Sequence, residues 1–316
     1  MEFRNLGDSG LRVSEIGLGC NNFGAKLDEQ QTQVVVNAAI DAGITLFDTA
    51  DVYGYTRSES FLGKALAKCR HDVVIATKFG LSAWDGEHRK GASRRWIMQA
   101  VEDSLTRLQT DYIDLYQLHM PDLATPVEET LRALDDLIRQ GKVRYIGCSN
   151  FSGWQIADAN WIARELVINR FISVQNEFSM LNRGVEREVL PTCEHFQLGL
   201  LPFFPLASGL LTGKYVRGAP PPEGSRLSGR RGAKSLTDDN FDLVERLSTF
   251  ARDRNRTMLD LAFAWLLAHR PVASVIAGAT SADQVGGNAK AAGWRLSAED
   301  MSEIHAIFTA ESGAGA

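Results

Sequence analysis

The chain has 316 residues, of which 44% are hydrophobic and 23% charged, and its formal net charge is −5 at pH 7. This composition is ordinary for a globular protein and excludes a chain that is disordered throughout. The acidic balance argues against a general nucleic-acid-binding surface, and the absence of any run of about 18 uncharged apolar residues argues against a membrane span.

The cysteines indicate a reducing compartment. The sequence has four of them, far apart and without a CxxC pair, at Cys20, Cys69, Cys148 and Cys193. Such spacing favours free thiols over a disulfide framework. The first five residues also lack the basic and then apolar form of a signal peptide. We therefore expect a cytoplasmic protein.

The predicted elements alternate between strands and helices along the chain. Phe3–Val13 predicts a β-hairpin with its turn at Asp8-Ser9-Gly10. Eight apolar runs predict strands, at Glu15–Gly19, Thr45–Ala50, Val73–Phe79, Tyr112–His119, Val143–Asn150, Ser173–Ser179, Gly199–Ala207 and Ser274–Thr280. Helical periodicity occupies Glu29–Ala42, Ser58–Cys69, Ser93–Leu108, Pro126–Gln140, Trp154–Leu166, Val185–Phe196, Asp239–Arg252, Met258–Ala268 and Ala298–Phe308.

Eight strand–helix alternations in about 300 residues predict a (β/α)₈ TIM barrel, in the α/β class. We expect one domain over residues 1–316, with an N-terminal hairpin, a long loop after the seventh strand and a C-terminal helical extension. The competing architecture, a doubly wound nucleotide-binding sheet, should carry G-x-G-x-x-G after an early strand. The nearest approach, Gly17-Leu18-Gly19, lacks the third glycine.

Chemistry in a barrel of this kind takes place at the carboxyl ends of the strands. Those ends carry Asp48 and Tyr53 after the second barrel strand, Lys78 at the third and His119 at the fourth. Taken singly, they also fit a helix cap, a rim aromatic, a surface lysine and a core histidine. As one acid, one base and two donors on neighbouring strands, they favour a catalytic site.

Three motifs resemble those of the aldo-keto reductase family. They are Phe47-Asp48-Thr49-Ala50-Asp51-Val52-Tyr53-Gly54, Thr77-Lys78-Phe79-Gly80 and Gln117-Leu118-His119. Their order and the elements around them resemble the branch that contains bacterial reductases and potassium-channel β-subunits. This resemblance implies a catalytic tetrad of Asp48, Tyr53, Lys78 and His119.

The tetrad suits the reduction of a carbonyl group, because a proton must reach the oxygen as a hydride reaches the carbon. Tyr53 would donate that proton, with its pKa lowered by the Lys78 ammonium. Asp48 would hold Lys78 charged, and His119 would orient the carbonyl as a neutral donor. We expect Asp51 to be a loop acid that faces solvent.

The resemblance also implies a nicotinamide cofactor. Ser149, Asn150 and Gln175 would hold its carboxamide, and Phe203 would stack on its ring. Further cofactor contacts are implied at Leu206, Ser208, Gly209, Lys214, Arg226, Gly278, Thr280, Gln284 and Asn288. The hydroxyls and cations in this set favour NADP(H), with NAD(H) as the alternative. Two positions depart from the family pattern, Phe204 in place of a small serine and Gly287 in place of an acid.

The partner is predicted to be a small carbonyl or alcohol substrate, contacted by Asn22, Phe23 and Trp84 through the resemblance. The sequence indicates neither the individual substrate nor the oligomeric state. One alternative function is a cofactor-binding regulatory or redox-sensing protein with slow residual activity. A metal-dependent hydrolase is the other, but the six histidines show neither HxH nor HExxH spacing, so no metal site is predicted.

Overall fold

The computed structural model describes residues 1–82, 89–228 and 232–309. It begins with an antiparallel hairpin of β1 (Phe3–Asn5) and β2 (Arg12–Ser14). Eight more strands follow, β3 (Ile16–Gly19), β4 (Leu46–Asp48), β5 (Val74–Phe79), β6 (Ile113–Leu118), β7 (Val143–Ser149), β8 (Ser173–Gln175), β9 (Gly199–Leu200) and β10 (Val275–Gly278). They form one sheet in the order β10-β3-β4-β5-β6-β7-β8-β9, with every neighbouring pair parallel.

The sheet closes through the segment that leads into β10. The backbone N–H of Leu200 donates to the Pro271 carbonyl at 2.7 Å, and that of Ala273 donates to the Leu200 carbonyl at 3.0 Å. The N–H of Ile276 donates to the Pro202 carbonyl at 2.9 Å. Because β9 is hydrogen-bonded on both sides, the predicted (β/α)₈ barrel is confirmed.

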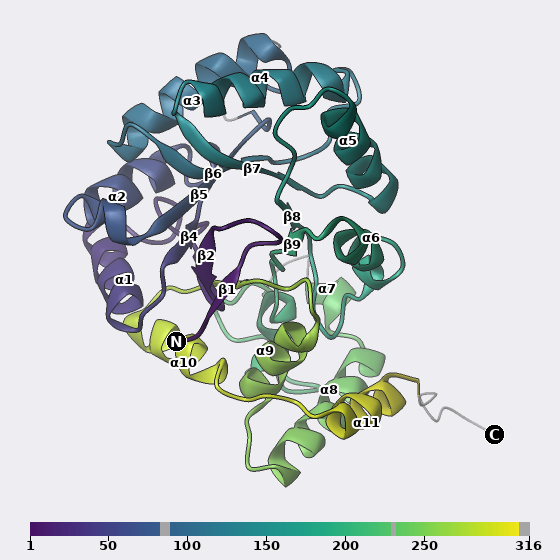
Figure 1. Cartoon of the computed structure of the whole chain (residues 1–316). Coiled ribbons are helices and arrows are strands. Elements are labelled where there is room, and N and C mark those ends of the chain that lie inside the picture. Colours follow the sequence, from purple (N-terminus) through teal and green to yellow (C-terminus); the bar gives the residue numbers. More distant parts are fainter. Residues whose placement is uncertain (83–88, 229–231, 310–316) are drawn as a thin grey trace.

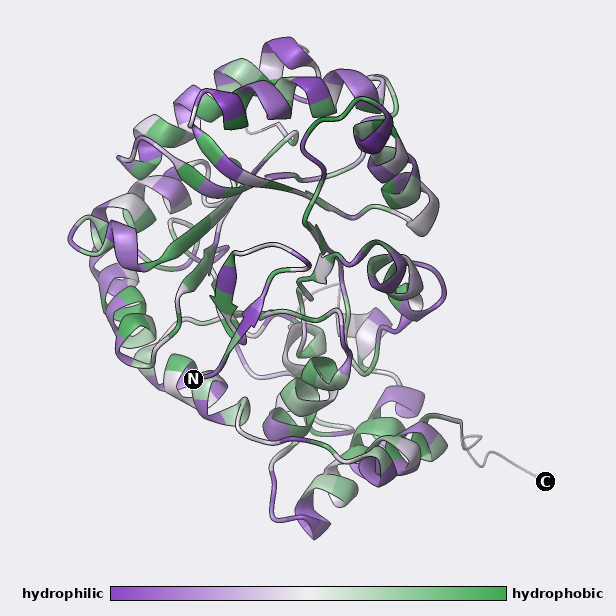
Figure 2. Cartoon of the chain, viewed as in Figure 1, coloured by the Kyte–Doolittle hydropathy of each residue, from purple (hydrophilic) through white to green (hydrophobic). Residues whose placement is uncertain are grey.

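Helices surround the strands (Figure 1). They are α1 (Glu29–Asp41), α2 (Arg57–Leu66), α3 (Arg94–Leu108), α4 (Val127–Arg139), α5 (Gly153–Glu165), α6 (Val189–Phe196), α7 (Gly232–Ser235), α8 (Asp238–Asp253), α9 (Met258–Ala268), α10 (Ala282–Ala291) and α11 (Ala298–Thr309). The helices α1 to α6 bury one face on the sheet, as in α4, where Leu131, Leu134 and Leu137 are buried while Arg132 is exposed. Figure 2 shows the same alternation of hydrophilic and hydrophobic residues along the helical ribbons.

The N-terminal hairpin covers one end of the barrel (Figure 1). Leu6 and Val13 are fully buried and pack against apolar side chains of the barrel interior, among them Leu46, Val74, Ala76, Leu115, Ile172, Leu201, Ala273 and Ile276. Most of these lie at or near the amino ends of the strands. The hairpin therefore closes the amino end, opposite the carboxyl end at which a barrel of this kind is expected to carry its functional residues.

The structure corrects some predicted boundaries. The strand predicted over Gly199–Ala207 ends at Leu200, because Pro202 and Pro205 have no N–H for a strand ladder. The helix predicted over Val185–Phe196 is two elements, a 3₁₀ turn (Gly184–Glu186) and then α6. The predicted cap Ser93 is confirmed, since its side chain accepts from Trp96 N at 3.4 Å.

The long loop after β9 and the C-terminal helix complete the chain. The loop opens with a 3₁₀ segment (Ala207–Thr212), and its Arg217 is ion-paired with three acids of α8, Asp238, Asp242 and Glu245. The basic residues Arg230 and Arg231 lie outside the described residues. None of the helices in residues 1–82, 89–228 and 232–309 is long and apolar enough to cross a membrane.

Candidate active site at the carboxyl ends of the strands

The four residues predicted at strand ends lie together in the structure. Asp48 is the last residue of β4, Lys78 lies near the end of β5, and His119 directly follows β6. Tyr53 lies in the loop between β4 and α2, where its ring centre is 5.8 Å from that of His119 in an edge-to-face arrangement. The same ring centre is 5.1 Å from the Lys78 ammonium nitrogen. These residues therefore form one cluster.

The Lys78 ammonium is held by a buried set of oxygen atoms. Its Nζ donates to Asp48 Oδ1 and Oδ2 and to the Thr49 carbonyl, each at 2.8 Å. Burial opposes the charge on Lys78, but Asp48 and then Tyr53 outweigh it, so the pKa of Lys78 is raised. Lys78 is therefore a cation at neutral pH, as predicted.

The pKa of Tyr53 differs from the expectation. Burial raises it above the usual value of 10.0, and the Asp48 charge adds to this rise. The Lys78 ammonium lowers the pKa of Tyr53, as predicted, but does not overcome burial. The expected net decrease is therefore wrong in this structure, and Tyr53 is a neutral phenol that carries its proton at neutral pH.

His119 is a neutral imidazole. Burial, together with the nearby Lys78 charge, lowers its pKa to about 3. Its backbone is fixed on both sides, because the N–H donates to the Phe79 carbonyl at 2.8 Å and the carbonyl accepts from Asn150 Nδ2 at 3.0 Å. Beside Tyr53, this ring can offer a neutral N–H donor to an oxygen atom.

Asp51 does not face solvent, so that prediction is wrong. The residue is only 1% exposed because the loop after β4 folds back onto β5, where the Asp51 N–H donates to the Lys78 carbonyl at 3.1 Å. Within the described part of the chain, neither carboxyl oxygen of Asp51 has a hydrogen-bond partner. Burial, followed by the nearby Glu59 charge, raises the pKa of Asp51 well above its usual value of 3.8.

A substitution at Asp51 should change the pH dependence of stability. The folded-state pKa of Asp51 is raised, so the stability that this carboxyl contributes is complete below its unfolded pKa and is lost as pH rises through the folded pKa. Asp51→Asn removes this titration. We expect the melting temperature of the variant, relative to that of the wild type, to increase as pH rises above about 4. Parallel melting curves across pH test this, and identical pH slopes would contradict it.

The residues predicted to hold the nicotinamide carboxamide form a hydrogen-bonded chain next to the tetrad. Ser149 Oγ donates to the Gln175 carbonyl at 2.8 Å, and Asn150 Nδ2 donates to Ser149 Oγ at 3.0 Å. Asn150 adopts a left-handed φ of 62°. Gln175 Nε2 donates to Asp48 Oδ1 at 2.8 Å, so this group reaches the tetrad directly.

The segment after β9 has an unusual backbone. Phe204, Ala207 and Ser208 have φ values of 51°, 45° and 58°, in the left-handed region that non-glycine residues rarely adopt. A Cβ on Gly209 would lie 2.7 Å from Cε and Nζ of Lys214, so glycine lets this cation fold over the segment. Phe203 and Leu206 are only partly buried. Strained backbone of this kind fits a ligand-holding loop.

The long loop returns to the end of β3 through Arg226. Its Nη2 donates to Asn21 Oδ1 at 3.1 Å and to Asn22 Oδ1 at 3.5 Å. Asn22 Nδ2 in turn donates to the Ala279 carbonyl at 3.2 Å, just after β10. Asn22, predicted as a substrate contact, therefore ties the predicted cofactor segments together.

The last predicted cofactor residues lie at the junction of β10 and α10. The N–H and Oγ1 of Thr280 donate to Gln284 Oε1 at 2.8 and 3.1 Å. Gly278 and Thr280 are exposed, whereas Asn288 is buried within α10. Ser281 caps α10, since its Oγ accepts from the Gln284 N–H at 3.3 Å, and the start of a helix is suited to an anion such as phosphate.

Of the other two predicted substrate residues, one is not supported by the geometry and the other is not described. Phe23 is fully buried in the main hydrophobic core, which does not fit a ring that contacts substrate. Trp84 lies outside the described residues.

Sequence reasoning missed Gln117, which is fully buried and donates to Asp48 Oδ1 from Nε2 at 3.4 Å. The signal was present, because Gln117 is a polar residue inside an apolar strand, two positions before His119 and therefore on the same face.

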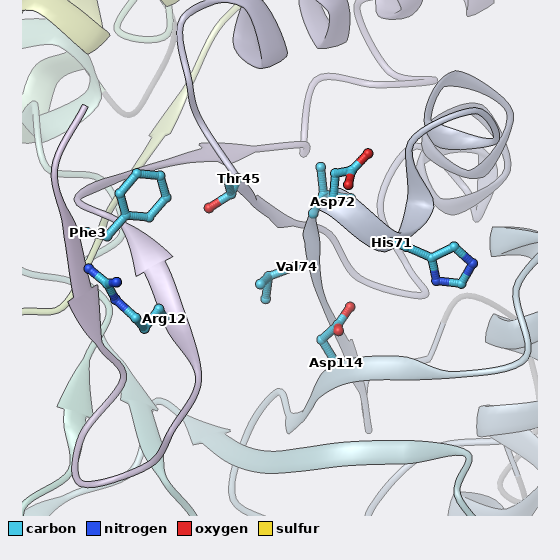
Figure 3. Close-up of a pocket in the computed structure, with 8 residues that line it drawn as sticks. Phe3, Arg12, Thr45, His71, Asp72, Val74 and Asp114 are labelled. Carbon is cyan, nitrogen blue, oxygen red and sulfur yellow. The ribbon is translucent and has the colours of Figure 1, made fainter.

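A hollow at the other end of the barrel is separate from this site (Figure 3). It lies near the amino ends of β4, β5 and β6, and is lined by Phe3, Arg12, Thr45, His71, Asp72, Val73, Val74 and Asp114. No group of three or more His, Cys, Asp or Glu side chains in the described ranges is suited to hold a metal ion.

Comparisons with known proteins agree with the geometry. The model of the aldo/keto reductase family matches residues 15–308. A probable voltage-gated potassium channel subunit beta of Oryza sativa subsp. japonica is 39% identical over 302 residues, covering 92% of this chain and 91% of that protein. The L-glyceraldehyde 3-phosphate reductase of Escherichia coli (strain K12) is 34% identical over 304 residues, covering 92% of this chain and 87% of that protein.

A third relative, the versiconal hemiacetal acetate reductase of Aspergillus parasiticus, is 35% identical over 313 residues, covering 90% of each chain. The family match spans nearly the whole chain, and the barrel carries the strand-end residues that the family resemblance implied. The chain therefore belongs to the aldo/keto reductase family of oxidoreductases.

Proposed function

We propose that the chain, as one barrel domain, is an NADP(H)-dependent reductase that converts aldehyde or ketone carbonyls to alcohols reversibly, with Tyr53 as the proton donor. The observation that carries this proposal is the cluster of Tyr53, Lys78 and His119 around the buried Asp48 carboxylate. Family members generally use NAD(P)H, and the preference for NADP(H) is part of the proposal.

Each residue of the cluster has a distinct role in this proposal. A bound nicotinamide supplies the hydride, and the protein must deliver a proton to the carbonyl oxygen. Tyr53 carries that proton because its raised pKa keeps the phenol neutral. Lys78 stabilises the phenolate left behind, and His119, neutral because its pKa is about 3, donates to the same oxygen.

The residues that would hold the cofactor fit a dinucleotide in several respects. The partly buried ring of Phe203 is available for stacking. The left-handed backbone at Ala207 and Ser208, with Lys214 folded over Gly209, supports an anion-binding segment. Thr280, exposed just before α10, places a hydroxyl and a backbone N–H near the start of that helix, where both donate to Gln284 Oε1.

The activity is tested by mixing the protein with NADPH and a panel of aldehydes and ketones. The panel should include L-glyceraldehyde 3-phosphate, because a relative is named for reducing it. We expect a carbonyl-dependent loss of the reduced-nicotinamide absorbance. No loss with any carbonyl, by a protein shown to bind NADPH, would overturn the reductase function.

That negative result would favour a second proposal, a cofactor-binding regulatory protein with slow residual activity. The similarity to a probable potassium channel subunit beta is the observation that favours it. The assay with NADPH and carbonyls separates the two proposals. Repeated turnover favours the reductase, whereas a regulatory protein needs only to bind the cofactor.

We expect NADPH to bind about ten- to hundredfold more tightly than NADH, a difference of about 1.4–2.8 kcal/mol. The 2′-phosphate needs donors and cations around it. Arg226 donates to Asn21 and Asn22, and Asn22 donates to the Ala279 carbonyl, so these contacts link a cation to the residue before Thr280. The preference stays modest because Gln284 already occupies the Thr280 N–H. Fluorescence titration with each cofactor measures both dissociation constants.

A variant pair on the same loop sharpens this test. Arg226→Met should reduce the preference for NADPH, whereas Arg217→Met should not, because Arg217 is paired with the acids of α8. NADH binding as tightly as NADPH to the wild type would rule out the proposed phosphate site.

A further inference from the structure

The Asp48 carboxylate is held by two amides as well as by Lys78. Gln175 of β8 donates to Asp48 Oδ1 at 2.8 Å, and Gln117 of β6 donates to the same oxygen at 3.4 Å. Both glutamines are buried, at 2% and 0% exposure. The amide nitrogens must face Asp48, because an amide oxygen in that place would be repelled by the carboxylate.

Neighbouring residues make room for this arrangement. Lys78, Gln117 and Gly147 are in register across β5, β6 and β7. A Cβ on Gly147 would lie 3.3 Å from Cγ of Gln117 and 2.5 Å from Ser173 Oγ, so the absence of a side chain leaves space for Gln117 to lie inside the barrel. Within the described ranges, Gln117 Oε1 and Ser173 Oγ have no hydrogen-bond partner.

The two amides compete with Lys78 for the charge of Asp48. The Lys78 ammonium has three N–H groups, and it interacts with both oxygens of Asp48, with the Thr49 carbonyl and with the Tyr53 side chain. The amide donors on Asp48 Oδ1 offset part of the carboxylate charge. They therefore weaken the hydrogen bond that Lys78 donates to this oxygen. More of the positive charge of Lys78 is then available to the Tyr53 oxygen.

We propose that Gln117 and Gln175 are positioning residues, whose amides hold Asp48 so that Lys78 acts on the Tyr53 phenol. This inference rests on the proposed function, since its purpose is to make Tyr53 a better acid. The titratable groups around the phenol are Asp48 on β4, Lys78 on β5, His119 after β6 and Cys20 after β3.

Gln117→Met is the main test, because it keeps the volume of the side chain and removes only the amide. We expect Tyr53 to ionise at a higher pH, kcat to fall about three- to tenfold, and KM to change by less than about twofold, because one hydrogen bond to a charged group is lost away from the substrate. Gln175→Met should raise the pH of Tyr53 ionisation further in the protein without cofactor, since its hydrogen bond to Asp48 is shorter. Ser173→Ala is the matched control inside the same barrel, and its kcat and its Tyr53 ionisation should match the wild type.

Ionisation of Tyr53 is read from tyrosinate absorbance, as the difference between each protein and the same protein with Tyr53→Phe. This measurement needs no turnover, so it decides the role of the amides even if the wild type reduces no carbonyl. Gln117→Glu gives a second variant, in which a protonated carboxyl donates to Asp48 at low pH and an ionised one repels it at high pH. We expect its kcat to fall more steeply with rising pH than that of the wild type.

Unchanged Tyr53 ionisation in both Gln117→Met and Gln175→Met would overturn the proposal. An equal change in Ser173→Ala would overturn it as well, because that hydroxyl makes no hydrogen bond to Asp48 among the described residues.

Discussion

Replacing Tyr53 by phenylalanine is expected to lower kcat by at least about 100-fold, because the variant loses only the transferable proton. The ring stays beside His119, at the 5.8 Å separation of the ring centres in the structure, so packing is retained. Affinity for NADPH should stay within a few-fold of the wild type. Steady-state kinetics and cofactor titration on the same preparation measure both quantities.

Tyr55→Phe is the matched control for this substitution. Tyr55 lies two residues further along the same loop, but its side chain is 82% exposed. Its turnover should equal that of the wild type. Turnover of Tyr53→Phe close to the wild-type value would exclude Tyr53 as the proton donor.

The second large effect is expected for Asp48→Asn, which removes the counter-ion of a fully buried cation. Breaking one partner of a buried ion pair costs about 3–5 kcal/mol of stability. Turnover should also fall, by about tenfold or more, because Lys78 loses the partner that keeps it charged and directed toward Tyr53. Chemical unfolding curves and kcat measured for the same variant test the two effects.

Asp51→Asn is the natural comparison, because Asp48 at the end of β4 and Asp51 in the loop that follows are both buried. Asp51 has a raised pKa and no hydrogen-bond partner within the described part of the chain, so its replacement removes little. We expect Asp51→Asn to retain most of the wild-type kcat. Equal losses of activity from the two substitutions would show that the wrong aspartate was assigned.

Much of the barrel follows from local sequence patterns. The eight strands and most helices were predictable because apolar runs and helical periodicity survive in each segment, and because Ser93 provides a cap with its side chain. The end of β9 was not predictable from these patterns. Residues 201–206 are mostly apolar and resemble a strand, but the prolines and the left-handed backbone at Phe204 end the strand at Leu200.

The tetrad was predictable from strand-end chemistry, whereas its electrostatics were not. The sign of the net pKa shift of Tyr53 depends on how far burial exceeds the effect of Lys78, and this balance exists only in the folded protein. Asp51 shows the same limit, because its burial depends on how the loop folds back onto β5. Gln117 needed the register of β6 against β5 before its contact with Asp48 was visible.

Transfer of a label from the cofactor tests the central claim most directly. The protein is given NADPH that carries deuterium at the transferable position of the nicotinamide, together with an aldehyde that it reduces, and the alcohol is analysed by mass spectrometry. If the chain catalyses carbonyl reduction as proposed, the deuterium appears on the former carbonyl carbon, and the rate of its appearance falls at least about 100-fold in Tyr53→Phe. An alcohol without deuterium, or label transfer at the wild-type rate in Tyr53→Phe, would contradict the account.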